Sequence, residues 1–129
     1  MKRNTLIVFE DGKPELERIA RSAAERLDPE THEVRLRAAS SVTIPEMLAA
    51  EIYLLGTDAP NSDAYEEMAR FLAGVNLAGR RAAFFGSSGA AVAWLRGICS
   101  DSEVAFFGTD FVQPKPDQSS IAAWIRALD

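Results

Sequence analysis

The chain has 129 residues, of which 47% are hydrophobic and 26% charged, and this length and composition predict one compact domain over residues 1–129. Nineteen acidic side chains against fourteen basic ones give a net charge of −5, so we expect neither nucleic acid nor a membrane surface as a partner. The single cysteine, Cys99, and the single histidine, His32, exclude an intrachain disulfide and a zinc site built from clustered Cys and His.

Five short apolar runs, each followed by turn residues, alternate along the chain with helical patterns. The runs cover residues 6–9, 34–36, 52–56, 82–86 and 104–108. Unbroken runs of this length are typical of parallel strands that are buried on both faces. Apolar residues at helical spacing occupy 16–27, 65–72, 91–98 and 121–128. This order predicts an α/β fold, a three-layer doubly wound sandwich with a five-stranded parallel sheet in the order 2-1-3-4-5.

The first apolar run bears on the location of the protein. It follows Met1-Lys2-Arg3 and ends at Glu10, which is too short for a signal peptide or a membrane span. A lone cysteine also suits a reducing compartment. We therefore expect a cytoplasmic protein.

The connection between the second and third apolar runs is short. Fourteen residues, 38–51, follow the second predicted strand before the third begins. They contain the capping-box pattern Thr43-x-x-Glu46 and the apolar pair Met47-Leu48. We therefore expect an abbreviated second helix in this connection.

Segments spread over nearly the whole chain carry a resemblance to a known family. Thr5 to Phe9 with the helix pattern after it, Ala50 to Gly56, Leu77 to Gly86 and the closing segment 107–124 have the order and spacing of short-chain flavodoxins. Response-regulator receivers share the strand order, but they normally have a full second helix. The resemblance implies the flavodoxin fold, with one FMN at the carboxyl edge of the sheet and electron transfer in single steps. It also implies that loops after the first, third and fourth strands hold the FMN.

The resemblance implies which positions of this chain correspond to these three FMN loops. They are Glu10, Asp11, Gly12, Lys13, Thr57, Asp58, Pro60, Ser87, Ser88, Gly89 and Val92.

The first of these loops departs from the family pattern, which is rich in Ser and Thr around the phosphate. This chain has Glu10 and Asp11 there instead, and Pro14 removes a backbone donor. A carboxylate ~5 Å from a phosphate costs about 3 kcal/mol per charge pair at an effective dielectric constant of ~20, and Lys13 offsets one such pair at most. We interpret the two acids as a solvated turn, followed by a helix that begins near Pro14.

The other two loops lack the aromatic side chains that cover the flavin ring in the family. The matching positions are Pro60 and Val92. Each missing aromatic contact removes about 0.5–1.5 kcal/mol beyond the area that it buries. Tyr65 and Trp94 are the nearest aromatic residues, but both lie on apolar helical stripes and are expected in the core.

Two other kinds of chemistry have weaker support. Ser88 lies in a strand-to-helix turn, but a Ser-His pair needs His32 at the same sheet edge, and His32 precedes the second strand. We therefore predict a helix cap at Ser88 and no enzyme activity.

Acidic residues at the carboxyl edge could hold Mg²⁺ as receiver domains do, but Gly56 occupies the position of the phosphoacceptor aspartate. These acidic residues are Glu10, Asp11, Asp58, Asp63 and Asp110.

Two functions from different classes follow from these loops. The first is a non-enzymatic binding or interaction module that binds FMN weakly or not at all and holds a protein partner or small ligand at the carboxyl edge. The alternative is an FMN-binding electron carrier that holds its cofactor through backbone amides. Those amides belong to Gly12, Lys13, Thr57, Ser87, Ser88 and Gly89. A magnesium-binding receiver-like domain is a third, weaker alternative.

Overall fold

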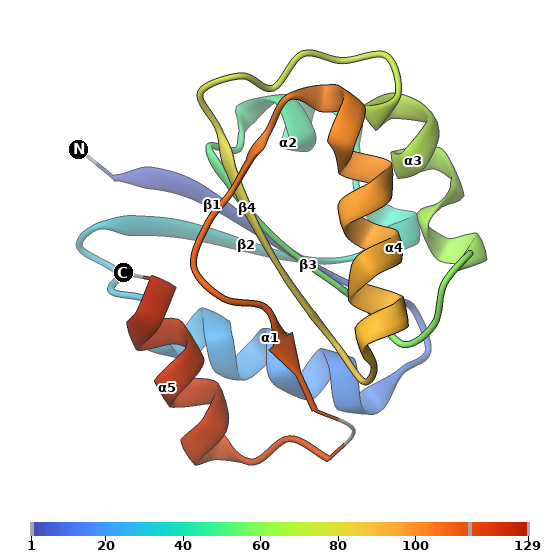
Figure 1. The fold of residues 1–129 in the computed structure, drawn as a ribbon. Helices are drawn as coiled ribbons and strands as arrows, with labels where there is room; N and C mark the ends of the chain where they lie inside the picture. Colours follow the sequence, from blue (N-terminus) through green and yellow to red (C-terminus); the bar gives the residue numbers. More distant parts are fainter. Residues whose placement is uncertain (1, 114, 129) are drawn as a thin grey trace.

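A computed structural model describes residues 2–113 and 115–128 of the chain. Its centre is a parallel sheet in the order β2-β1-β3-β4-β5, with β6 also paired to β4 (Figure 1). This order confirms the predicted topology. The strands are β1 (Arg3–Phe9), β2 (His32–Ala38), β3 (Ile52–Thr57), β4 (Arg81–Gly86), β5 (Ala105–Phe106) and β6 (Phe111–Val112).

Helices cover both faces of this sheet. In Figure 1, α1 and α5 lie on one side of the strands, and α2, α3 and α4 lie on the other. No helix in residues 2–113 and 115–128 is long and apolar enough to cross a membrane. The α-helices are α1 (Pro14–Arg26), α2 (Ile44–Ala49), α3 (Glu66–Leu72), α4 (Gly89–Cys99) and α5 (Gln118–Leu128). Short 3₁₀ turns are η1 (Ala39–Ser41), η2 (Asp63–Tyr65) and η3 (Ser100–Ser102).

The sheet separates two hydrophobic cores. Along β1, Leu6 and Val8 pack toward α2, α3 and α4, whereas Ile7 and Phe9 pack toward α1 and α5. All six residues of β3 are buried, as a strand covered on both faces requires. This double coverage accounts for the apolar runs of β1, β3 and β4. The runs at β2 and β5 were also expected to be buried on both faces, but these strands lie at the sheet edges and contain exposed residues.

The connection between β2 and β3 is abbreviated, as predicted. Its helix, α2, has six residues and begins with the capping box at Thr43. The Glu46 amide donates to Thr43 Oγ1 at 3.3 Å, and the Thr43 amide donates to Glu46 Oε1 at 3.1 Å. The Tyr53 hydroxyl of β3 donates to the carbonyl oxygen of Met47 at 2.6 Å, which ties this short helix to the sheet.

The fifth strand differs from its prediction as one run over 104–108. It consists of two short segments, β5 and β6, and both pair with β4. Gly108 between them has φ of +62°, a left-handed conformation that interrupts an extended strand. Asp110 Oδ2 accepts a hydrogen bond from Arg96 Nε of α4 at 2.8 Å and forms an ion pair with Arg96 Nη2 at 2.7 Å. The Trp124 indole of α5 donates to the Thr109 carbonyl at 2.6 Å, so both helices hold this interruption.

The two aromatic side chains predicted to lie in the core do so to different extents, and Cys99 lies in the core as well. Tyr65 and Cys99 are fully buried. Trp94 is half-buried and meets the Tyr65 ring edge to face, with centroids 6.1 Å apart. Burial raises the pKa of the Cys99 thiol to about 12, which disfavours its reactive thiolate form. Packing therefore accounts for these residues.

One glycine inside a helix gives a stability prediction. Gly97 is exposed in α4, and a Cβ added there would meet no atom within 4 Å. Alanine restricts the unfolded chain more than glycine does and has a higher helix propensity. We expect Gly97→Ala to raise the free energy of unfolding by about 0.5–1 kcal/mol, measured by urea denaturation. An unchanged or lowered value would contradict this expectation.

Candidate functional site

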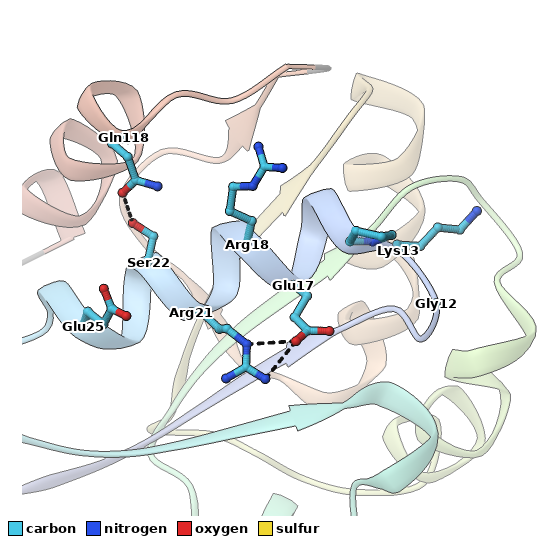
Figure 2. A pocket seen from close by; sticks show the side chains of 9 residues that line it. Gly12, Lys13, Glu17, Arg18, Arg21, Ser22, Glu25 and Gln118 are labelled. Atoms are coloured by element: carbon cyan, nitrogen blue, oxygen red, sulfur yellow. Dashed lines mark hydrogen bonds and ion pairs between the residues drawn. The ribbon is translucent and has the colours of Figure 1, made fainter.

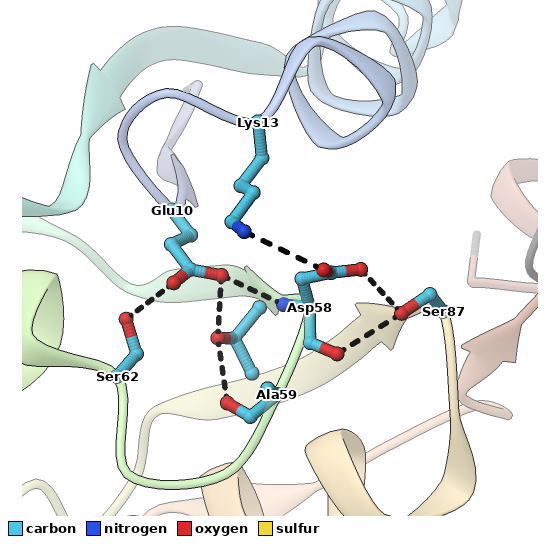
Figure 3. A network of polar contacts seen from close by, with 7 residues as sticks. Glu10, Lys13, Asp58, Ala59, Ser62 and Ser87 are labelled. Carbon is cyan, nitrogen blue, oxygen red and sulfur yellow. Dashed lines mark hydrogen bonds and ion pairs between the residues drawn. The ribbon is translucent and has the colours of Figure 1, made fainter.

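Three loops meet at the carboxyl edge of the sheet, where β1, β3 and β4 end. They are the loop after Phe9, the loop 58–62 and the turn at Ser87 and Ser88. Figure 3 shows that side chains from all three point toward one another. In α/β proteins, ligands bind outside the carboxyl ends of the strands. This cluster is therefore the candidate functional site.

The carboxylate of Glu10 joins the first loop to the second. Its Oε1 accepts a hydrogen bond from the Asp58 amide at 2.9 Å and lies 3.1 Å from the Thr57 hydroxyl. Its Oε2 accepts a hydrogen bond from the Ser62 hydroxyl at 2.8 Å (Figure 3). Hydrogen bonds to a carboxylate are roughly twice as strong as those between neutral groups. Glu10 thus uses the donors that the second loop presents to the site.

Asp58 joins the second loop to the first and third. The Ser87 hydroxyl lies 3.0 Å from the Asp58 carbonyl oxygen and 2.5 Å from its Oδ1. Lys13 Nζ lies 3.6 Å from Asp58 Oδ2 (Figure 3). The Lys13 and Asp58 side chains are 45% and 43% exposed, so solvent screens this ion pair and it adds little stability. The Lys13 side chain therefore lies beside Asp58, and this ion pair holds it only weakly.

The turn before α1 forms for local reasons. Gly12 adopts φ of +71°, which favours glycine, and Lys13 is the N-cap residue in extended conformation. Pro14 is the first residue of α1. The backbone N–H at this position has no hydrogen-bond partner within the helix, so a proline there costs no hydrogen bond. The predicted helix start at Pro14 is confirmed.

Asp11 joins the first loop to the segment after β2. Its Oδ1 accepts a hydrogen bond from the Ser40 amide at 3.0 Å, and its Oδ2 accepts one from the Ser40 hydroxyl. Partial burial raises the pKa of Asp11, but these hydrogen bonds lower it by more, and the pKa lies below its ordinary value. The resulting stability is present above the unfolded-state pKa and is lost as the pH falls through the folded value.

Asp11 lies in a turn as predicted and both acids are partly exposed, but their carboxylates are not bonded to solvent alone. Both carboxylates accept hydrogen bonds from other loops, and Ser40 and Ser62 are partners that the sequence did not reveal. They lie 29 and 52 residues away in the chain. The available signal was their position after β2 and β3, because loops that follow parallel strands share one edge of the sheet.

The remaining loop positions point in different directions. Ser88 caps α4, since its hydroxyl accepts a hydrogen bond from the Ala91 amide at 3.2 Å, as predicted. Gly89 and Pro60 are exposed. Val92 is only 4% exposed and packs in the core under α4, so its side chain does not face the loops.

The buried hydroxyl of Tyr65 contacts the backbone of the two strands from which the first and second loops leave. The Gly56 amide donates to Tyr65 Oη at 3.1 Å, and this hydroxyl lies 2.7 Å from the Gly56 carbonyl oxygen. It also lies 3.3 Å from the carbonyl oxygen of Val8 in β1. Burial raises the pKa of Tyr65 well above its ordinary value, so the hydroxyl keeps its proton as a donor. Tyr65 thereby fixes the ends of β1 and β3, from which the first two loops leave.

A cavity of about 510 Å³ lies beside the first loop, along α1 and the start of α5 (Figure 2). Gly12 and Lys13 line one end of it. Its other charged groups include the ion pair of Arg21 with Glu17 at 2.8 Å. Lys13, Arg18 and Glu25 are the other charged lining residues, so cations and acids are nearly balanced and the cavity has little concentrated charge to attract an anion.

The residues required for a serine nucleophile or for a magnesium-binding receiver domain are not assembled at the carboxyl edge in the described part of the chain. His32 is at the amino edge of the sheet, where its Nδ1 lies 2.9 Å from Thr5 Oγ1, far along β1 from Ser88. A Cβ at Gly56 would overlap the Phe85 ring, so this position has no room for a phosphoacceptor side chain. Over residues 2–113 and 115–128, no three His, Cys, Asp or Glu side chains form a group that could hold a metal ion.

Comparisons with known proteins agree with this architecture. No protein-family model matches the sequence, and no curated protein matches it either. Among solved structures, a short-chain flavodoxin associated with a non-canonical PDU bacterial microcompartment has a TM-score of 0.84 at 12% identity, over 98% of this chain and 96% of that one. The chain has the flavodoxin fold.

Two further flavodoxins extend this likeness. The flavodoxin of Streptococcus pneumonia TIGR4 has a TM-score of 0.83 at 19% identity, over 97% of both chains. A Fusobacterium nucleatum flavodoxin bound to flavin mononucleotide has a TM-score of 0.70 at 12% identity, over 96% of this chain and 95% of that one. At these identities the shared flavodoxin fold does not carry site residues across.

Proposed function

We propose that this flavodoxin-fold chain is a non-enzymatic binding module that holds FMN weakly or not at all. Its carboxyl edge binds a protein partner or another small ligand in the cytoplasm. One observation carries this proposal. The Glu10 carboxylate accepts hydrogen bonds from the Asp58 amide and the Ser62 hydroxyl, so these donors of the second loop are occupied by the protein itself.

The charge of the first loop supports the same conclusion. Glu10 and Asp11 bring two carboxylates to the loop that matches the phosphate-binding loop of flavodoxins. At ~5 Å and an effective dielectric constant of ~20, each carboxylate costs a phosphate about 3 kcal/mol per charge pair. Lys13 is the nearby cation, and it is already 3.6 Å from the Asp58 carboxylate. The residues of this loop do not fit a phosphate.

The sites for the flavin ring give further support. Pro60 is exposed but has no aromatic face, and the Val92 side chain is buried under α4. Tyr65 is fully buried and its hydroxyl is used between β1 and β3, so its ring does not replace the missing contacts. Without stacking partners, a bound flavin would lose about 0.5–1.5 kcal/mol per missing contact.

An FMN-dependent electron carrier is the second candidate, and one observation favours it. The Fusobacterium nucleatum flavodoxin with the same fold is bound to flavin mononucleotide. In this chain the cofactor would depend on backbone amides of the three loops, such as those of Gly12 and Ser88. When bound, FMN would supply one-electron chemistry, while the chain would supply position and shielding from water.

The test is the colour and FMN affinity of the purified protein. We expect the freshly purified chain to have no flavin absorption between about 300 and 500 nm, and added FMN to bind with a Kd well above ~1 μM. Quenching of FMN fluorescence during titration measures that Kd. Co-purified flavin or a sub-micromolar Kd would overturn the proposal in favour of the electron carrier.

A further inference from the structure

The outer edge of the sheet on the β2 side is a second surface with a specific chemistry. Among the described residues, β2 is the terminal strand and pairs with β1 alone, so no described strand lies on its other side. The Leu36 carbonyl oxygen of β2 accepts a hydrogen bond from the Arg37 side chain at 2.9 Å. An unpaired strand edge presents N–H and C=O groups that can pair with another chain. The seven residues of β2 include no proline or glycine that would prevent such pairing.

The exposed charges on this edge alternate in sign, so they do not protect the edge against pairing with a second copy. Glu33 and Arg35 are two residues apart, so they lie on the same face of the strand, and both are exposed. Neither makes an ion pair with the described part of the chain, whereas Arg37 pairs with Glu46 at 2.7 Å. A strand edge with charges of one sign would repel its own copy, but Glu33 and Arg35 can attract it.

The register of an antiparallel pair follows from these charges. Across a two-fold axis that passes through Val34, Glu33 lies opposite Arg35 of the second copy, and Arg35 lies opposite its Glu33. Opposite charges that face each other across two strands stabilise the pair. An axis through Glu33 sets Glu33 against its own copy. An axis through Arg35 sets Arg35 against its own copy and brings Glu33 opposite Arg37, whose charge Glu46 already neutralises. An axis through Leu36 sets Arg35 against Arg37.

The other face of β2 fits the same register. Val34 and Leu36 are half-buried beside α1. A groove of about 450 Å³ runs along this edge, lined by Phe9, Arg21 and residues 33–37. In the register centred on Val34, the same faces of both sheets lie together, so the partner's Val34 lies against Val34 in this groove and its Leu36 lies opposite His32. The pairing would cover apolar surface that α1 leaves partly open.

We infer that the β2 edge binds a second copy of this chain, through antiparallel pairing of the two β2 strands centred on Val34. The surface is separate from the loops at the carboxyl edge and does not depend on the function proposed for them. Because only one short strand per copy takes part, the dimer is weak and depends on concentration.

Charge reversal tests this register. Sedimentation velocity of the full chain, from ~10 μM to ~1 mM, measures the dimer Kd for wild type, Glu33→Arg, Arg35→Glu and the double variant. Each single variant creates two like-charge contacts across the axis, so we expect its dimer Kd to rise roughly tenfold. The double variant exchanges the two charges and restores both attractive contacts. Its Kd should return close to the wild-type value.

Two control variants separate register from net charge. Glu66→Arg and Arg70→Glu on α3 change the net charge by the same amounts, and both side chains are exposed. They should leave the dimer Kd unchanged, and circular dichroism should show that all variants fold. A wild-type chain that stays monomeric to ~1 mM would overturn the inference. So would single variants that associate like wild type, or a double variant that stays as weak as the single ones.

Discussion

FMN should bind about 10- to 100-fold more tightly to the Glu10→Ser/Asp11→Thr variant than to the wild-type chain. Each carboxylate costs a phosphate about 3 kcal/mol at ~5 Å with an effective dielectric constant of ~20, and the substitution removes two of them. It also frees the Asp58 amide and the Ser62 hydroxyl, which now donate to Glu10. Loss of these contacts loosens the loop 58–62, which keeps the gain below the full electrostatic value. Quenching of FMN fluorescence measures the change.

Three controls show whether phosphate repulsion is the cause. Riboflavin lacks the phosphate, so its affinity should barely change. Added salt should reduce the difference between the variant and wild type, because it screens the repulsion in the wild-type chain. Asp63→Ser removes an exposed charge from the same edge and should have little effect. If the double variant binds FMN no better than wild type, the missing aromatic contacts at Pro60 and Val92 become the explanation.

Gly56→Ala should lower the free energy of unfolding by about 3 kcal/mol, at the upper end of the range for overpacked cores. A Cβ at this position overlaps the Phe85 ring, and that ring is fully buried. It also packs against Trp124, with centroids 5.8 Å apart, so it has no free space into which to turn. Urea denaturation measures the loss, and the midpoint of thermal unfolding should fall by roughly 10 °C.

Gly97→Ala is the matched control for this substitution. It adds the same methyl group at a site with no neighbour within 4 Å, so it should stabilise the chain slightly. If Gly56→Ala lowers the free energy of unfolding by less than about 0.5 kcal/mol, then the Phe85 ring can move to make room for the Cβ, and the tight packing inferred for it is wrong.

Much of the fold could be predicted from the sequence because its signals are local. The unbroken apolar run at Ile52–Thr57 is a strand buried on both faces, and the Thr43 capping box begins the short α2. The split of the fifth strand could not be predicted in this way. It depends on Arg96 and Trp124, which reach Asp110 and Thr109 from two helices that flank the strand in sequence.

The candidate site was predictable in its location but not in its contacts. Strand ends placed the three loops at one edge of the sheet, and the Ser88 cap followed from its turn. The role of Glu10 depends on partners 47 to 52 residues away, and local sequence does not determine which donor a carboxylate reaches. The same residues in this turn are compatible with carboxylates that contact other loops and with carboxylates that contact only solvent, so the sequence does not distinguish the two cases.

The tie between Glu10 and the second loop also changes how this edge responds to dilution. A loop held by a bound ligand loses its hold when the ligand concentration falls below its Kd, because the stabilisation follows mass action. The Glu10 carboxylate is part of the chain, so its local concentration near the Asp58 amide is fixed by the covalent backbone. The order of these loops is therefore intrinsic to each molecule and independent of the supply of any cofactor.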